Sequence, residues 1–307
     1  MKKRQIGTSD LYVSELALGC MTLGTDEQKA KSIIDQALDA GINFLDTADL
    51  YDFGVNEEIV GKAIKGKRDD IVLATKVGNR FEQGKEGWYW DPSKAYIKEE
   101  VKESLRRLQV DYIDLYQLHG GTTDDPIDET IEAFEELIQE GLIRYYGISS
   151  IRHNVIREYV KRSNIVSVMM QYNLFDRRPE EEMLDYLHSN NISVLARGPL
   201  AKGMLSDQAL KQLERKGDNG YLDYSYEEVK HVVNSFMMYT GVDHSANAIA
   251  LQYVLRHPAV AAAVFGASST KQLEESVTYT KAKPMNDTVY QTLQQLTKPI
   301  KYDKHRE

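Results

Sequence analysis

Four polar side chains of this sequence follow the pattern expected of a proton-transfer site. Asp46 ends one short β-prone run, Lys76 ends a second, and His119 directly follows a third. Tyr51 lies five residues after Asp46, on a stretch that can fold back over the ends of these runs. An acid, an ammonium, an imidazole and a phenol are groups that general acid–base catalysis uses.

This set of groups is suited to protonating the alkoxide that forms when a hydride adds to a carbonyl. A free tyrosine is too weak an acid for this at neutral pH, because its pKa is about 10. A lysine ammonium roughly 4 Å away would stabilise the phenolate by about 4 kcal/mol at an effective dielectric of about 20, lowering the tyrosine pKa by about 3 before Asp46 offsets part of the effect. We therefore expect Tyr51 to be the acid, with His119 orienting the carbonyl oxygen or passing a proton.

Eight β-prone segments, each followed by a segment of helical period, supply the frame for these residues. The strands are expected at 15–19, 43–46, 71–76, 112–118, 143–148, 166–172, 193–196 and 261–265. The helices are expected at 26–40, 56–65, 93–108, 127–138, 154–162, 180–189, 246–257 and 271–280. Eight such repeats favour an α/β fold of one domain over 1–307, a closed (β/α)8 TIM barrel rather than an open doubly wound sheet.

Several segments fall outside this repeat. Residues 4–6 and 11–13 flank a turn-forming Gly-Thr-Ser-Asp run, so we expect an N-terminal β-hairpin at the bottom of the barrel. Residues 198–225 have no regular pattern, and extra helices near the C-terminus are expected at 226–239 and 286–296.

The active site of such a barrel lies at the C-terminal ends of its strands. Asp46, Lys76 and His119 end three consecutive strands there, and neighbouring strands lie about 4.8 Å apart. The loops 78–92 and 120–125 and the C-terminal tail are expected to set substrate specificity. The first loop contains Trp88, Tyr89 and Trp90, which either line a substrate pocket or pack on the barrel top.

Composition disfavours several other classes of protein. The net charge of −9 argues against nucleic acid binding. Cys20 is the only cysteine, so internal disulfides are excluded and a reducing cytoplasm is favoured. No segment resembles a signal peptide or a membrane span, so no membrane association is expected. The seven histidines form no pair four residues apart and no cluster with cysteine, so no metal site is expected.

Four runs resemble the signature of the aldo/keto reductase family, and the resemblance covers nearly the whole chain. They are Asn43-Phe44-Leu45-Asp46-Thr47-Ala48-Asp49-Leu50-Tyr51, Ala74-Thr75-Lys76-Val77-Gly78, Asp111-Tyr112-Ile113-Asp114-Leu115-Tyr116-Gln117-Leu118-His119 and Gly147-Ile148-Ser149-Ser150. The sequence is similar to the bacterial branch related to potassium-channel β subunits. This implies an NADP-dependent reductase of a small aldehyde or ketone, with Tyr51 as general acid/base, Asp46 and Lys76 tuning it and His119 shaping the substrate site.

The cofactor needs a phosphate site of its own, because the chain lacks the Gly-x-Gly-x-x-Gly fingerprint of a Rossmann fold. The run Gly198-Pro199-Leu200-Ala201-Lys202-Gly203 follows the seventh expected strand, where barrels often bind phosphate, and Lys202 adds a charge. Met204 and Leu205 replace the lysine and hydroxyl residue of a P-loop, which argues against a nucleotide triphosphatase.

The resemblance implies which residues hold the cofactor. The run 198–203 would cover the pyrophosphate, and Asp46 belongs to the cofactor site as well. The other implied residues are Cys20 and Met21 near the nicotinamide ribose, Ser149 and Gln171 at the carboxamide, and Gly266, Ala267, Ser268, Gln272, Glu275 and Ser276 at the adenosine and its 2′-phosphate.

The sequence departs from the family pattern at two positions. Arg197 stands where many relatives have an aromatic residue stacked on the nicotinamide; a guanidinium plane can also stack, but it adds positive charge. Ser269 stands where many relatives have a basic residue against the 2′-phosphate, with Lys271 nearby. We still expect NADP rather than NAD.

Two other functions fit part of the pattern. A regulatory or redox-sensing module that binds NADP with little turnover would retain the same residues, and the sequence does not separate it from a reductase. A phosphate-binding barrel isomerase would need no nicotinamide. The sequence indicates neither the physiological substrate, nor protein partners, nor the oligomeric state.

Overall fold

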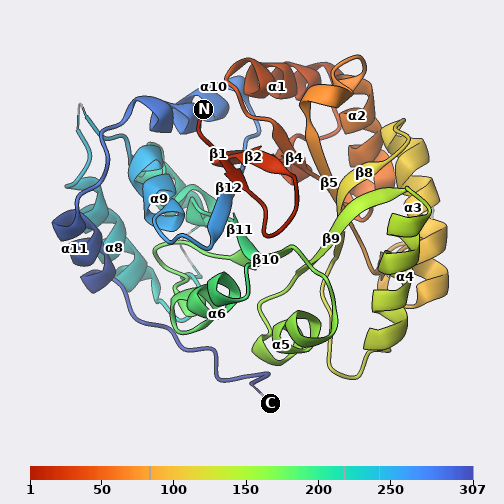
Figure 1. Cartoon of the computed structure of the whole chain (residues 1–307). Helices are drawn as coiled ribbons and strands as arrows, with labels where there is room; N and C mark the ends of the chain where they lie inside the picture. Colours follow the sequence, from red (N-terminus) through yellow and green to blue (C-terminus); the bar gives the residue numbers. More distant parts are fainter. Residues whose placement is uncertain (83, 217–218, 242, 307) are drawn as a thin grey trace.

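Eight parallel strands form a closed barrel that helices surround (Figure 1). The computed structural model describes residues 1–82, 84–216, 219–241 and 243–306. Around the barrel the strands follow the order β3, β4, β5, β8, β9, β10, β11 and β12, and β12 pairs with β3 to close it. The predicted (β/α)8 TIM barrel is confirmed.

The barrel strands agree with the sequence prediction to within one residue at each end. They are β3 (Leu16–Gly19), β4 (Phe44–Asp46), β5 (Val72–Val77), β8 (Ile113–Leu118), β9 (Ile143–Ser149), β10 (Ser167–Gln171), β11 (Ser193–Arg197) and β12 (Val260–Gly266). Every residue of β5 and β8 is buried, because one face of each strand lines the barrel interior and the other meets the helices.

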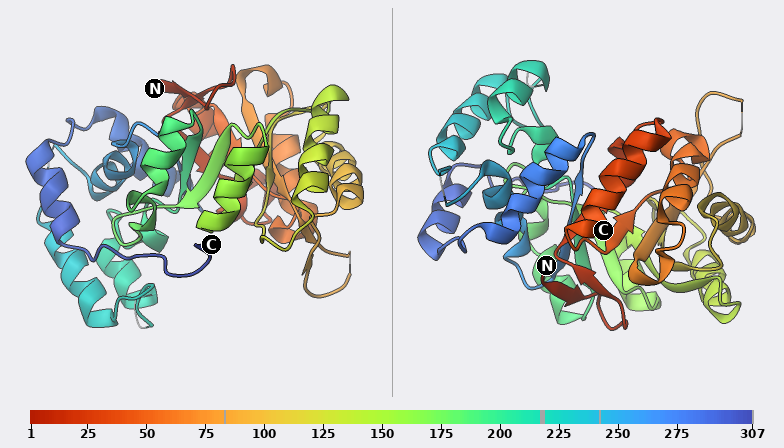
Figure 2. Two further views of the ribbon diagram at one scale, coloured as in Figure 1. Left: turned by 60° about the horizontal axis from the view of Figure 1, so that its bottom comes forward. Right: turned by 90° about the horizontal axis from the view of Figure 1, so that it is seen from above.

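An outer ring of helices follows these strands, and Figure 2 shows it from two further directions. The helices are α1 (Glu27–Asp39), α2 (Val55–Ile64), α3 (Lys94–Leu108), α4 (Ile127–Gln139), α5 (His153–Arg162), α6 (Met183–Ser189), α9 (Ala246–Leu255) and α10 (Thr270–Val277). The helix expected at 180–189 is shorter, because the 3-10 turn η4 (Arg178–Glu180) with Pro179 precedes it. The helix expected at 271–280 ends at Val277 and continues as η6 (Thr278–Lys281).

The barrel interior is apolar towards its bottom, where an N-terminal hairpin closes it. Strands β1 (Lys3–Gln5) and β2 (Tyr12–Ser14) pair antiparallel, one residue away from their expected positions. Ile6, Leu11 and Val13 of this hairpin belong to one buried cluster with interior residues of the barrel strands. The expected plug at the bottom of the barrel is therefore confirmed.

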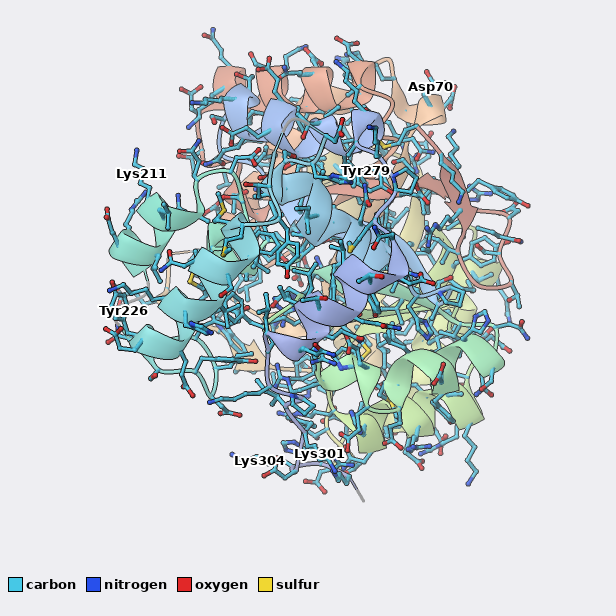
Figure 3. All side chains as sticks on the ribbon, turned by 90° about the vertical axis from the view of Figure 1, so that its left-hand side faces the viewer. Asp70, Lys211, Tyr226, Tyr279, Lys301 and Lys304 are labelled. Carbon is cyan, nitrogen blue, oxygen red and sulfur yellow. The ribbon has the colours of Figure 1, made fainter. Side chains whose placement is uncertain are left out.

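Elements outside the repeat lie at the barrel ends and sides. The expected extra helices are α8 (Tyr226–Met237) and α11 (Asp287–Gln295), and Figure 3 shows α8 with Tyr226 on the outside of the barrel. Two further elements were not predicted from the sequence: the hairpin of β6 (Asn79–Arg80) and β7 (Tyr89–Trp90), and the helix α7 (Ala209–Lys216). The remaining 3-10 turns are η1 (Cys20–Thr22), η2 (Tyr51–Gly54), η3 (Arg68–Asp70) and η5 (Ala201–Gly203). None of the helices in the described ranges is both long and apolar enough to cross a membrane.

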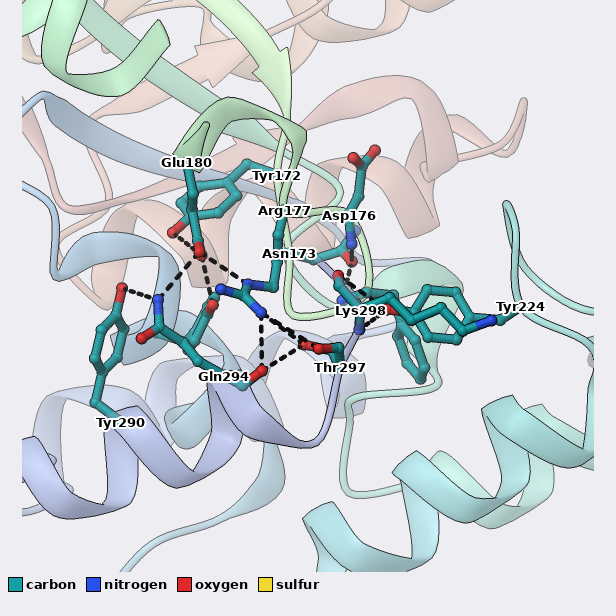
Figure 4. A network of polar contacts seen from close by, with 12 residues as sticks. Tyr172, Asn173, Asp176, Arg177, Glu180, Tyr224, Tyr290, Gln294, Thr297 and Lys298 are labelled. Atoms are coloured by element: carbon teal, nitrogen blue, oxygen red, sulfur yellow. Dashed lines mark hydrogen bonds and ion pairs between the residues drawn. The ribbon is translucent and has the colours of Figure 1, made fainter. Parts of the chain in front are cut away.

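A largely buried polar network anchors the C-terminal segment to the loop after β10 (Figure 4). Glu180 accepts hydrogen bonds from the hydroxyls of Tyr172 and Tyr253 and from Nε2 of Gln294, and it pairs with Arg177 at 2.8 Å. Nη1 of Arg177 donates to the backbone oxygen of Gln294 at 2.8 Å. The end of α11 is therefore fixed against the side of the barrel, and the tail continues outside it past Lys301 (Figure 3).

Candidate active site

The structure brings Asp46, Lys76, Tyr51 and His119 together at the C-terminal ends of β4, β5 and β8. Nζ of Lys76 donates to Oδ2 of Asp46 at 2.7 Å, to the backbone oxygen of Thr47 at 2.7 Å and to the hydroxyl of Tyr51 at 3.2 Å. The ring of His119 meets the ring of Tyr51 edge-on, with centroids 5.9 Å apart. The phenol, the ammonium and the imidazole thus form one continuous cluster.

A left-handed turn directs Tyr51 back over the strand ends. The residues that follow it in η2, Asp52 and Phe53, have φ angles of 49° and 52°, and Gly54 has a φ of 89°. A β carbon at Gly54 would lie 2.8 Å from the Arg107 side chain, so glycine is needed there for two reasons. The backbone N–H of Tyr51 donates to the oxygen of Ala48 at 3.2 Å, which closes the turn.

A buried ion pair fixes this turn to β5. Nε of Arg107 on α3 bonds Oε2 of Glu57 on α2 at 2.7 Å, and Oε1 of Glu57 accepts from the hydroxyl of Thr75 at 2.6 Å. Thr75 directly precedes Lys76, and Arg107 packs against Gly54. The network therefore connects the turn that carries Tyr51 to the strand that carries Lys76.

Lys76 keeps its proton although its side chain is only 1% exposed. Burial lowers the pKa of this lysine, but the charges of Asp46 and Tyr51 more than compensate, so that the pKa rises above its usual range. The second oxygen of Asp46 accepts from Nε2 of Gln117 at 3.0 Å. Gln117 was not among the predicted site residues. It could have been recognised as a polar residue two positions after Leu115, on the interior face of the strand.

His119 is neutral at physiological pH. Burial, together with the charges of Lys76 and Arg197, lowers the pKa of its imidazole to about 3. Its Nδ1 is buried and has no hydrogen-bond partner among the described residues. A neutral imidazole can donate one hydrogen bond but has no extra proton to transfer, so the geometry favours the orienting role over the proton-passing one.

A cavity of about 360 Å³ opens beside His119. Its lining residues are Asn79, Trp88, Trp90, His119, Gly120, Gly121, Thr122, Ser149, Ser150, Ile151, Arg152, Met169 and Arg197. Trp88 and Trp90 thus line a pocket, and Trp90 also packs against the hydrophobic core, whereas Tyr89 is 52% exposed and is not part of the lining.

Two glycines give Trp90 its place in this cavity. A β carbon on Gly78 would lie 2.6 Å from the indole ring, and one on Gly120 would lie 3.2 Å from it. Nε1 of the indole donates to Oδ1 of Asp125 at 2.9 Å. The loops 78–92 and 120–125 therefore shape the cavity, as expected for loops that set specificity.

The C-terminal tail does not line this cavity among the described residues, contrary to its expected role in specificity. It runs along the outside and reaches α5, where the backbone oxygen of His305 accepts from the N–H of Asn154 at 2.9 Å. The hollows next to the tail, of about 610 and 480 Å³, share no lining residue with the cavity beside His119. The network at Arg177 and Glu180 holds the tail away from the barrel mouth.

Two of the residues expected at the nicotinamide line the same cavity. Ser149 and Arg197 line it, at the ends of β9 and β11. Nη1 of Arg197 donates to Oε1 of Gln171 at 3.0 Å, and Nε2 of Gln171 donates to the hydroxyl of Tyr221 at 3.2 Å. Met21 is 60% exposed after β3.

The glycine-rich run lies directly after β11, the seventh barrel strand. Gly198, Ala201, Lys202 and Gly203 have φ angles of 65°, 46°, 57° and 91°, so the backbone is repeatedly left-handed. No atom would lie within 4 Å of a β carbon on Gly198, and its oxygen accepts from Nδ2 of Asn173 at 3.0 Å. Such a loop is open to a ligand and held at its start. Pro199 and Ala201 are buried, Leu200 is half-buried and Lys202 is exposed.

The residues expected at the adenosine follow β12, beside this loop. Gly266 is exposed and Ala267 is buried. Oε1 of Gln272 accepts from both the N–H and the hydroxyl of Ser268, at 2.8 and 3.0 Å. Ser269 caps α10, because its side chain accepts from the N–H of Gln272.

Three of the expected residues have other contacts in the structure. Glu275 accepts from Nε2 of Gln208 at 3.0 Å. Ser276 is buried and accepts from Nδ2 of Asn247 at 2.9 Å. The thiol of Cys20 is also buried, which raises its pKa, so neither the Cys20 nor the Ser276 side chain reaches the surface.

Comparison with known proteins agrees with this geometry. The model of the aldo/keto reductase family matches residues 15–298. The chain belongs to this family. The aldo/keto reductase is 60% identical, over 100% of both chains, to the uncharacterized oxidoreductase YqkF of Bacillus subtilis strain 168.

Two further relatives bear on the cofactor of this aldo/keto reductase. The solved structure of aldo-keto reductase AKR11C1 from Bacillus halodurans in its holo form is 60% identical, covers 100% of both chains and has a TM-score of 0.93. A protein of Escherichia coli K12 described as an NADH-specific methylglyoxal reductase is 30% identical, over 90% of this chain and 93% of its own. Membership of the family makes the chain an oxidoreductase that reduces carbonyl groups with a nicotinamide cofactor.

The residues at the barrel mouth fit such a nicotinamide dinucleotide. Arg197 forms no ion pair with a carboxylate of the described residues, so its charge is available to a phosphate or a ring. Gly198 leaves open space above the left-handed run. His119, whose Nδ1 has no hydrogen-bond partner among the residues that the structure describes, borders a cavity where a polar group of a ligand can contact it. An open, left-handed backbone run and the cavity beside His119 thus both lie at the ends of the barrel strands.

The depressed pKa of His119 predicts an acid-sensitive contribution to stability. The imidazole has a pKa of about 3 in the folded chain and about 6.5, the ordinary value for histidine, in the unfolded chain, so the unfolded chain binds more protons between these pH values. Relative to His119→Gln, the wild type should lose about 1–2 kcal/mol of unfolding free energy between pH 7 and pH 5. Urea unfolding of both proteins at each pH measures this. Parallel stability curves would show that His119 is not held neutral.

Proposed function

We propose that this aldo/keto reductase transfers a hydride from NADPH to a small aldehyde or ketone, with Tyr51 as the proton donor. The observation that supports this most directly is the ammonium of Lys76, which lies 3.2 Å from the phenolic oxygen of Tyr51, whose ring contacts His119 at the cavity. We also infer a reducing, cytoplasmic setting, because the single cysteine of the chain is buried and unpaired.

In this proposal each side chain of the cluster has a separate task. When bound, the reduced nicotinamide supplies the hydride that adds to the carbonyl carbon. Tyr51 gives its hydroxyl proton to the carbonyl oxygen, which becomes the alcohol, and in the reverse direction it takes that proton back. Lys76 stabilises the phenolate left behind, and Asp46 and the oxygen of Thr47 keep the ammonium in place.

His119 acts as the hydrogen-bond donor that orients the carbonyl oxygen. Its low pKa keeps it neutral, so it presents an N–H group without competing with Tyr51 for the role of acid. The edge-on contact of the two rings places both side chains at the same side of the cluster. A carbonyl oxygen held between them would receive one hydrogen bond and one proton.

Removing the phenolic hydroxyl tests the catalytic assignment. Tyr51→Phe should lower kcat/KM for 4-nitrobenzaldehyde with NADPH by about 10²- to 10⁴-fold, because the proton donor is lost. Steady-state NADPH oxidation measures the rate, and quenching of protein fluorescence shows that NADPH still binds. Tyr12→Phe, at the far end of the barrel, is the control and should keep wild-type activity.

Equal rates in the wild type and Tyr51→Phe would contradict the proposal. If both rates were equal because both were close to zero while NADPH still bound, the alternative of a redox-sensing module with little turnover would be favoured. If NADPH caused no fluorescence change in either protein, the isomerase alternative would be favoured instead.

The residues after β11 and β12 support NADP as the cofactor. In our proposal the pyrophosphate lies under the run 198–203, with Arg197 and Lys202 as its positive charges. The adenosine 2′-phosphate lies at the start of α10, where Ser269 caps the helix and Lys271 is 76% exposed. The name of the Escherichia coli relative specifies NADH, so the 2′-phosphate is the feature to test.

Titration with both dinucleotides tests the phosphate preference. We expect NADPH to bind about tenfold or more tightly than NADH, because the extra phosphate gains charge-assisted hydrogen bonds. Lys271→Ala should weaken NADPH binding about two- to fivefold, as an exposed ion pair would, and should leave NADH binding unchanged. Lys281→Ala, an exposed lysine in η6, is the matched control. Equal affinity for the two dinucleotides would overturn the assignment of NADP.

A further inference from the structure

The cavity beside His119 is positively charged in a chain whose net charge is −9. Two of the residues that line it are arginines, Arg152 and Arg197, and no described lining residue is an aspartate or a glutamate. His119 is neutral and adds no charge. Such a local excess of one charge raises the concentration of ligands of the opposite charge.

Arg152 presents its guanidinium to this cavity without a carboxylate partner. It lies between β9 and α5, where its backbone N–H donates to Oγ of Ser150 at 3.1 Å. Nη1 donates to the backbone oxygen of Gly121 at 2.8 Å, and no ion pair with a carboxylate forms within the described ranges. One bond to a neutral oxygen uses one of five guanidinium N–H groups, so donors remain for a ligand.

The carboxylate of Asp125, in the neighbouring loop 120–125, already accepts hydrogen bonds from other donors. Asp125 accepts from Nε1 of Trp90 at 2.9 Å, and from the N–H and the hydroxyl of Thr122 at 2.7 and 2.8 Å. It does not line the cavity. Its role is to hold the indole and the loop, which leaves the charge of Arg152 to the pocket.

The two arginines have different neighbours. Arg197, at the end of β11, donates a hydrogen bond to Gln171 at the end of β10. It directly precedes the run 198–203 that we assign to the cofactor. Arg152 instead donates to Gly121 and lines the cavity with Gly121 and Thr122, which belong to the loop expected to set specificity. Of the two charges, the one at Arg152 is therefore available to the substrate.

We propose that preferred substrates carry a carboxylate, which Arg152 binds at the end of the molecule away from the carbonyl. The guanidinium matches a carboxylate in shape and charge, and one arginine suits a single negative charge better than a phosphate dianion. The body of the substrate would lie against Trp88 and Trp90. This inference rests on the proposed function, because it takes the reacting carbonyl to lie at Tyr51 and His119.

Matched aldehydes test the preference in the holoenzyme. 4-Formylbenzoate and 4-formylbenzamide have the same shape and differ in charge. We expect the wild type to show about tenfold or higher kcat/KM for the acid, and Arg152→Leu to reduce this acid-to-amide ratio by about tenfold. Arg157→Leu removes the same charge from α5 at a site that does not line the cavity, and should leave the ratio unchanged. Arg152→Lys keeps a charge and should retain part of the preference.

A wild-type preference for the amide, or an equal ratio in the wild type and Arg152→Leu, would overturn the proposal. If Arg152→Leu does not fold, Arg152→Lys and Arg152→Gln replace it. An acid-to-amide ratio below that of the wild type in Arg152→Lys supports the role of the guanidinium. Acid-to-amide ratios equal to that of the wild type in both Arg152→Lys and Arg152→Gln refute it.

A binding measurement separates this inference from the proposed function. The only two tryptophans of the chain, Trp88 and Trp90, both line the cavity, so intrinsic fluorescence reports on its occupation. Benzoate should change the fluorescence at concentrations about tenfold below those needed with benzamide, and Arg152→Leu should abolish the difference. If benzoate bound more tightly than benzamide but 4-nitrobenzaldehyde were not reduced, the proposed reductase activity would be refuted and the anion site supported. Reduction of neutral aldehydes with no preference for benzoate would refute the anion site alone.

Discussion

The site depends on one buried ammonium, that of Lys76. A lysine head group has three N–H donors, and here Asp46, the backbone oxygen of Thr47 and Tyr51 accept one each. An unpaired charge at this depth would be strongly destabilising, so the carboxylate of Asp46 is what allows the ammonium to be buried. Because the third acceptor is a phenol, the same ammonium would, in the proposed reaction, stabilise the phenolate that Tyr51 leaves behind.

The barrel arranges these groups by its layers. The hairpin fills the bottom with apolar side chains, so polar residues gather at the top, where β4, β5 and β8 end side by side. Behind the cluster, the Glu57–Arg107 pair connects the turn of Tyr51 to β5. Beside it, the neutral His119 faces a cavity that carries the charges of Arg152 and Arg197. Tyr51, His119 and the charged pocket are thus held by different elements.

Much of this was predictable from the sequence, because strands buried on both faces read as short apolar runs. The barrel strands and the positions of Asp46, Lys76 and His119 at their ends follow from that pattern. The contact of Gln117 with Asp46 was not predictable, since it depends on residues 71 positions apart. The packing of the Trp90 ring against Gly78 and Gly120 and the course of the C-terminal tail were not predictable either, because both are set by packing between distant segments.

The most direct test of the central claim is a double-mutant cycle on kcat/KM with Tyr51→Phe, Lys76→Met and the double variant, with urea unfolding to show that each is folded. If the ammonium acts through the phenol, losing Lys76 should cost little once the hydroxyl is gone, and the double variant should be within about threefold of Tyr51→Phe. If the two losses multiply instead, Lys76 and Tyr51 act independently, and the account is contradicted.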